Sequence, residues 1–129
     1  MADKLSMEHN AIKNVTDLKV YLLTNRLTKE VFHLTKKIPG EDYSLIYKLR
    51  RSSLSVTKSI KDGFAKRKYE NVFIRHLVES IVYSEEMRGW LEFSRDCNYI
   101  TMEEFNSFDS RYREVEAMLN SLINELRTS

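Results

Sequence analysis

Glu30 and His33 are three residues apart, which is the spacing of the carboxylate and imidazole ligands in di-iron helical bundles. Such a centre needs two copies of the motif and two further inward-pointing glutamates, but the sequence holds one copy. If Leu27 points into a helical core, His33 lies about 120° away from the core direction at ~100° per residue. We therefore expect no metal, and instead a solvated pair between Arg26 and Glu30 with His33 beside it.

Arg26 and His33 also have the Arg-x6-His spacing of HEPN-type helical ribonucleases, and seven residues bring them to one side of a helix. The imidazole could accept a proton while the guanidinium stabilises phosphate charge. Leu27 follows the arginine, however, where those enzymes usually carry a polar residue. A metal-free ribonuclease is therefore an alternative, and our main expectation is a protein without catalytic residues or cofactors.

The other motifs that support catalysis lack their minimum parts. The sequence contains no G-x-S-x-G elbow, no glycine-rich phosphate loop and no C-x-x-C pair. Cys97 is the single cysteine and excludes an internal disulfide, and the first fourteen residues hold no apolar signal segment. No apolar run approaches the ~20 residues of a membrane helix, so we expect a cytoplasmic protein that does not span a membrane.

Positive charge is concentrated in one part of the chain, although the net charge is only +2. Residues 48–68 carry eight basic groups and one acidic group, whereas 1–47 are nearly balanced and 69–98 and 99–129 are each net −3. A merely solvated face normally mixes both signs, so this segment indicates an anionic partner. The candidate nucleic-acid-binding residues are Lys48, Arg50, Arg51, Lys58, Lys61, Lys66, Arg67 and Lys68.

On a helical wheel, four of these cations fall within about 100° of one another, opposite the apolar positions of the same helix. They are Arg50, Arg51, Lys58 and Lys61. Tyr47, Phe64 and Tyr69 lie close enough in sequence to offer stacking surfaces. No base-reading residues can be identified, so we predict binding to the backbone of RNA or DNA with little sequence preference, with RNA favoured. A protein-interaction scaffold without nucleic acid is the alternative.

Four segments have helical periodicity and must position these residues. The first helix is expected from Thr16, as its N-cap, to Lys37. The second starts near Asp42 and ends at Gly63 in a left-handed turn. The third is expected over 69–97, and the fourth opens with the capping box Thr101-Met102-Glu103-Glu104.

Length and composition agree with an all-α protein of one domain. The 129 residues are 42% hydrophobic and include only three Gly and one Pro, too few for the many turns of a β-sandwich or barrel. Helices joined by short links favour an antiparallel up-down-up-down four-helix bundle over residues 16–129, preceded by a polar leader over 1–15.

Several apolar residues lie away from the stripes that a single bundle would bury. They are Tyr21, Phe32, Leu54, Val82, Trp90 and Phe93. The segment over 72–93 is apolar on more sides than one stripe can cover, so we predict that the protein self-associates.

Seven short segments, taken in order, carry a family resemblance. They are Asp17-Leu18-Lys19-Val20-Tyr21, Leu34-Thr35-Lys36-Lys37-Ile38-Pro39, Tyr43-Ser44-Leu45, Leu49-Arg50-Arg51-Ser52-Ser53-Leu54-Ser55-Val56, Ile60-Lys61-Asp62-Gly63, Ile74-Arg75-His76-Leu77 and Asn98-Tyr99-Ile100-Thr101. In these segments the chain resembles the small four-helix-bundle proteins encoded within intervening sequences of bacterial 23S ribosomal RNA genes. Ser59 stands where that family usually has Asn.

The resemblance implies an antiparallel bundle that assembles with copies of itself, commonly into a pentamer. The family that the chain resembles includes relatives that serve as accessory proteins of retroelements, so a reverse transcriptase or a ribonucleoprotein is an implied partner. It implies no established catalytic residues.

Overall fold

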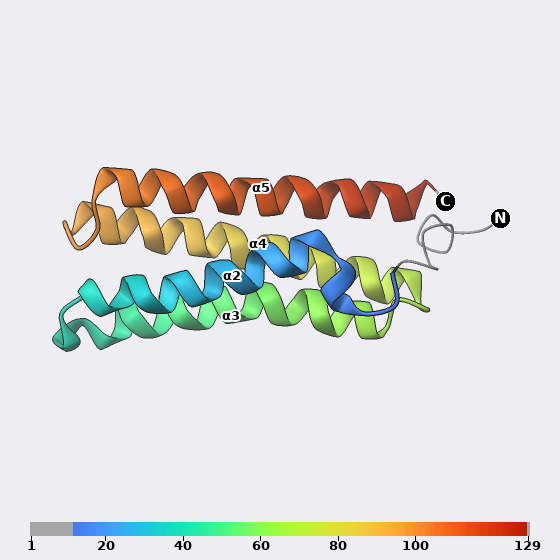
Figure 1. Cartoon of the computed structure of the whole chain (residues 1–129), viewed down its shortest axis with the longest axis horizontal. Coiled ribbons are helices and arrows are strands. Elements are labelled where there is room, and N and C mark those ends of the chain that lie inside the picture. The colour runs from blue at the N-terminus through green and yellow to red at the C-terminus, as the bar shows by residue number, and fades with distance from the viewer. Residues whose placement is uncertain (1–11, 129) are drawn as a thin grey trace.

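The computed structural model describes residues 12–128, which form a bundle of four long helices. They are α2 (Lys19–Leu34), α3 (Tyr43–Ala65), α4 (Glu70–Asp96) and α5 (Met102–Arg127). Short 3₁₀ turns lie at Val15–Asp17, Thr35–Lys37 and Gly40–Asp42. Successive helices run in opposite directions along an elongated body (Figure 1). The prediction of an all-α four-helix bundle is confirmed.

The core contains the apolar stripes that the periodicity predicts. Leu27, Leu49, Leu77 and Leu119, one from each helix, are fully buried. The same is true of most positions of the four stripes, whereas Leu23, Phe105 and Leu122 pack only partly against the core. The described residues of the predicted leader also contribute, because Ile12 and Val15 pack against this cluster; its residues 1–11 lie outside the described part of the chain.

Buried hydroxyl groups let the helices approach closely. Thr28 on α2 donates from Oγ1 to the carbonyl oxygens of Thr24 and Ser53 at 2.9 and 3.0 Å, which connects α2 to α3. Ser80 on α4 donates to the carbonyl of Val56 on α3 at 2.8 Å. Each of these small polar side chains is satisfied by a backbone acceptor, so its burial carries little desolvation penalty.

Three helix boundaries differ from the prediction. The first helix was expected to reach Lys37, but α2 ends at Leu34 and the 3₁₀ turn Thr35–Lys37 follows it. Thr16 is not the N-cap of the first helix: Asn14 and Asp17 form a capping box around the turn Val15–Asp17, and α2 begins at Lys19. Gly63 does not end the second helix in a left-handed turn, because it has no positive φ and α3 continues to Ala65. The capping box of the last helix is confirmed, with Thr101 Oγ1 accepting from the Glu104 amide at 3.0 Å.

Candidate nucleic-acid interface

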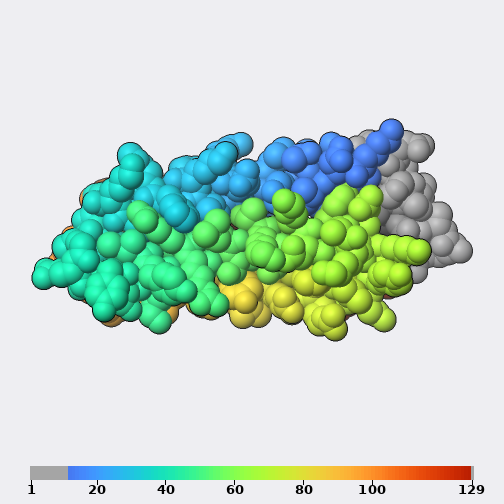
Figure 2. Space-filling model, turned by 90° about the horizontal axis from the view of Figure 1, so that it is seen from below, coloured from blue at the N-terminus to red at the C-terminus, as the bar shows by residue number. Residues whose placement is uncertain are grey.

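The outer face of α3 presents a row of cations. Leu49, Val56 and Ile60 are fully buried against the rest of the bundle, so positions half a turn away point outward. Five exposed cations follow this outward direction and the turn after the helix; we call them the basic strip, and they are Arg51, Lys58, Lys61, Lys66 and Lys68. Figure 2 looks onto this face, where α3 runs along the middle of the visible surface with α2 beside it.

The remaining three predicted cations are turned toward other parts of the bundle. Arg50 points toward the end of α2 and not outward. Its Nε donates to Thr35 Oγ1 at 2.9 Å, and its guanidinium lies 4.9 Å from the centre of the Phe32 ring. The Lys48 ammonium lies 5.0 Å above the Trp90 ring on α4. These two side chains therefore cover apolar surface on the neighbouring helices as well as carrying charge.

Arg67 is held by the end of α3. Its guanidinium lies 4.0 Å from the centre of the Phe64 ring and donates to the Phe64 carbonyl at 3.0 Å. Its Nε is buried without a hydrogen-bond partner among the described residues. Phe64 is therefore a buried support for Arg67 and not an exposed stacking surface.

Carboxylates of the described chain neutralise little of the basic strip. Asp62 binds Lys58 at 2.6 Å, and this hydrogen bond lowers the pKa of Asp62. Lys58 itself stays 74% exposed, so its ammonium can exchange Asp62 for another anion. The other four strip cations form no ion pair within residues 12–128. The acidic residues of α4 and α5 thus leave the strip positively charged.

Exposed tyrosines interleave with these cations. Tyr47 is 59% exposed and accepts a hydrogen bond at 3.0 Å from Arg51, which raises the pKa of the Arg51 guanidinium. Tyr69 is 61% exposed, with the Lys68 ammonium 5.8 Å from its ring centre. A phosphate held by the strip would therefore have planar apolar surfaces beside it, on which bases can stack.

A second group of cations is not apparent when charge is summed over long segments of the sequence. Arg26, Lys29 and Lys36 are exposed on the side of α2 that faces away from α3, where they line a groove toward α5. Counting residues 1–47 together hides them behind the acidic residues of the leader and the α2–α3 link. Charge counted helix by helix would have found them, since the stretch 19–37 has five basic residues and one acidic residue.

Glu30 does not pair with Arg26, contrary to the expected pair within the helix. Its carboxylate binds Arg111 on α5 at 2.8 Å, across the groove. His33 is exposed and lines the same groove as Arg26, so the two residues of the ribonuclease spacing do share one site. The ion pair of Glu30 therefore joins two helices, whereas the expected pair lay within α2.

The apolar residues expected outside the core divide into two groups. Val82, Phe93 and Leu54 are 53%, 52% and 50% exposed. Tyr21, Phe32 and Trp90 are only partly buried, the last two beneath Arg50 and Lys48 respectively. Val78, at 40% exposure, joins Val82 and Phe93 on the outer side of α4.

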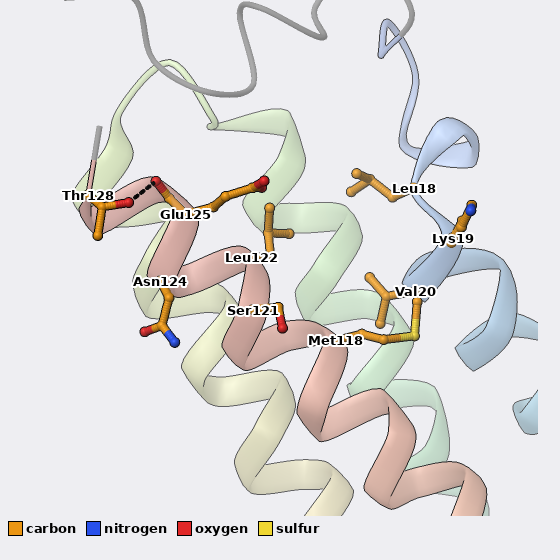
Figure 3. Close-up of a pocket in the computed structure, with 9 residues that line it drawn as sticks. All are labelled: Leu18, Lys19, Val20, Met118, Ser121, Leu122, Asn124, Glu125 and Thr128. Carbon is orange, nitrogen blue, oxygen red and sulfur yellow. Dashed lines mark hydrogen bonds between the residues drawn. The ribbon is translucent and has the colours of Figure 1, made fainter.

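A further hollow of about 660 Å³ lies between the start of α2 and the end of α5 (Figure 3). Leu18, Val20, Met118 and Leu122 make its walls largely apolar, and Lys19 is the single cation among its lining residues. Without a cluster of like charges, it offers no arrangement comparable to the basic strip.

The fold and the charge distribution define the class: a small helical bundle with a cationic outer helix and an apolar core that contains a few buried hydroxyl groups. The chain belongs to the 23S rRNA-intervening sequence protein family, whose model matches residues 16–121. This confirms the resemblance that the seven sequence segments predict.

A solved structure supports the fold. It is described as a protein with unknown function from the S23 ribosomal protein family of Bacteroides thetaiotaomicron VPI-5482, and it is 23% identical in sequence with a TM-score of 0.74. The match covers 81% of this chain and 97% of the other. No curated protein matches the chain significantly. Within the described residues, no helix is both long and apolar enough to cross a membrane.

Proposed function

We propose that this protein binds the sugar-phosphate backbone of nucleic acid, RNA in preference to DNA, through the basic strip and without catalysing a reaction on it. The observation that carries the proposal is the near absence of carboxylates against the strip, where Asp62 alone pairs with a strip cation among the described residues. An excess of unpaired cations on one face attracts a polyanion by releasing its counterions.

RNA is favoured by two features. The exposed rings of Tyr47 and Tyr69 suit unstacked bases, which occur in single-stranded and looped RNA. The description of the family also refers to 23S rRNA. Because the strip offers ammonium and guanidinium groups to phosphates, binding should depend little on base sequence.

The test removes two strip cations that have no carboxylate partner, in the variant Arg51→Gln/Lys61→Gln. Each lost phosphate contact on a single strand changes the salt exponent by about 0.7, so two contacts correspond to about a 25-fold loss of affinity near 0.1 M salt. The measurement is fluorescence anisotropy with a labelled single-stranded RNA.

The matched control is Arg113→Gln/Arg127→Gln, which removes the same charge from exposed positions on α5. We expect it to change RNA affinity less than twofold, because α5 carries more acidic than basic residues. Equal losses in both variants would show that net charge, and not the strip, governs binding. Unchanged affinity in the strip variant would leave the protein-interaction scaffold as the better interpretation.

Self-association is the second part of the proposal, and the outer side of α4 supports it. Val78, Val82 and Phe93 are large apolar residues that the described chain leaves half exposed on one helix. A second copy would remove this area from water, and the family resemblance makes a pentamer the expected assembly.

The variant Val82→Glu/Phe93→Glu should therefore be monomeric at micromolar concentration where the unmodified protein is oligomeric. Sedimentation velocity measures the difference. Leu22→Gln is the control, since it removes exposed apolar area from α2 and should not change the assembly. A monomeric unmodified protein would refute self-association.

Arg26 and His33 leave a ribonuclease as a second candidate function, because they line one groove. Metal-independent cleavage of RNA that is lost in His33→Gln would favour it over binding alone.

A further inference from the structure

The groove between α2 and α5 is separate from the basic strip. α2 contacts α3 through Thr28 and faces α5 through Glu30, so the groove lies on the side of α2 away from α3, whereas the strip lies on the outer face of α3. The groove has a volume of about 570 Å³. It exists because α2 and α5 touch each other less than the other long helices that pack together in residues 12–128.

Two ion pairs join α2 or the turn after it to α5 and neutralise the carboxylates that line the groove. Glu30 binds Arg111 at 2.8 Å, and Lys37 binds Glu104 at 2.5 Å. The hydrogen bond from Lys37 lowers the pKa of Glu104, so this carboxylate stays charged near neutral pH. The acidic residues that line the groove are therefore already occupied by cations.

The other charged residues of the groove are all basic. Arg26, Lys29 and Lys36 line it together with His33, and none of the four forms an ion pair within the described residues. Once the two bridging pairs cancel, three full positive charges remain around one hollow. Such a site attracts an anion.

The floor of the groove is apolar. Leu34 and Phe108 line it and are 5% and 6% exposed, and the Arg111 guanidinium lies 4.8 Å from the centre of the Phe108 ring. The two side chains therefore offer only a small apolar contact, at their exposed edges. A ligand that fits both parts carries a phosphate joined through a short linker, such as a ribose, to a planar or apolar group. Guanidinium groups suit phosphate because their parallel N–H groups match two of its oxygens.

We propose that this groove binds a nucleotide, with its phosphate held by Arg26, Lys29 and His33 and its base or ribose against Leu34 and Phe108. The proposal goes beyond backbone binding by the basic strip and does not depend on it. The nucleotide is either a free mononucleotide or one residue of an RNA strand, and the chemistry recognised is the same.

The test is a titration of isotope-labelled protein with AMP, with inorganic phosphate and with a short single-stranded RNA, observed by NMR. We expect AMP to shift amide signals within 26–37 and near Phe108, and to bind more tightly than inorganic phosphate. Shifts at these positions with the RNA alone would support the groove as a site for a nucleotide within a strand.

The variant Arg26→Gln/His33→Gln should weaken this binding about tenfold or more, because it removes two charge-assisted contacts. Both side chains are exposed, so the variant should fold. Arg51→Gln/Lys61→Gln is the matched control and should leave the groove shifts unchanged, even if it abolishes RNA binding by the strip.

Three results would overturn the inference. The first is the absence of groove shifts with both millimolar AMP and the RNA, and the second is unchanged affinity in Arg26→Gln/His33→Gln. The third is inorganic phosphate binding as tightly as AMP, which would remove any role for the apolar floor. Each of these is independent of whether the basic strip binds RNA.

Discussion

Arg88 lies between α4 and α5, where its guanidinium contacts two carboxylates of α5. Its Nε donates to Asp109 at 2.9 Å and its terminal nitrogen to Glu116 at 3.1 Å. Glu116 also accepts from the buried Ser84 hydroxyl at 2.8 Å. Burial alone would raise the pKa of Asp109, but hydrogen bonds from Arg113 and Arg88 outweigh it and lower that pKa.

Arg88→Gln should therefore destabilise the bundle by about 2 kcal/mol at pH 7, because it leaves Glu116 without its cation and leaves Asp109 with only the exposed Arg113. The pKa of Asp109 is lower in the folded state than its value of 3.8 in the unfolded chain, so its ionisation stabilises the fold when the pH is above 3.8. This contribution is lost as the pH falls through the lower folded-state pKa. The penalty should shrink below about pH 4. Urea unfolding at pH 7 and pH 3 measures it, and an equal penalty at both would contradict this account.

The control is Arg113→Gln, which removes the other donor to Asp109. The Arg113 side chain is 64% exposed, so water can replace it. We expect a cost below about 1 kcal/mol at either pH.

At this scale the sequence did not predict where each candidate cation points. Arg50 and Arg51 are neighbours on one wheel sector, yet Arg50 turns toward Phe32 and Thr35 while Arg51 stays exposed beside Tyr47. A long side chain chooses among partners on other helices, and a wheel drawn for one helix does not contain those partners.

Gly63 lies where α3 and α4 pack closely, near the link that joins them. A methyl group placed on Gly63 would lie 2.6 Å from Cβ of His76 and 3.2 Å from a ring carbon of Phe73. The glycine is needed because the two helices approach closely, and not because the chain takes a left-handed turn.

Gly63→Ala should destabilise the protein by about 1–2 kcal/mol, since the strain of overpacking exceeds the gain in helix propensity. Gly89→Ala should instead stabilise it by up to about 1 kcal/mol, because a methyl group there meets nothing within 4 Å. Thermal unfolding of both variants checks the contrast. A Gly63→Ala protein as stable as Gly89→Ala would show that the close approach can relax.

The helices themselves were predictable because apolar spacing reports directly on which face is buried. The third helix was predicted over 69–97 and is found at Glu70–Asp96, and Thr101 caps the last helix as its sequence indicates. The ends near Thr16 and Gly63 were wrong for different reasons. The first depends on a competing turn capped by Asn14, and the second on contact with a helix distant in sequence.

Basic residues are concentrated in the first two long helices and acidic residues in the last two. Residues 12–68, which contain α2 and α3, carry fourteen basic and five acidic side chains, whereas residues 69–129 carry six basic and twelve acidic ones. A polyanion should therefore approach the side of α2 and α3 and be repelled from α4 and α5. The sequence predicted the strip on α3 but not the groove, because the groove depends on the spacing between α2 and α5.

The central claim is that a cationic face of the bundle binds the nucleic-acid backbone. Its most direct test is the salt dependence of RNA affinity for the unmodified protein and for Arg51→Gln/Lys61→Gln. With five strip contacts on a single strand, the slope of log affinity against log salt should be about −3.5, and the variant should reduce its magnitude by about 1.4. A slope near zero, or the same slope in both proteins, would contradict the claim.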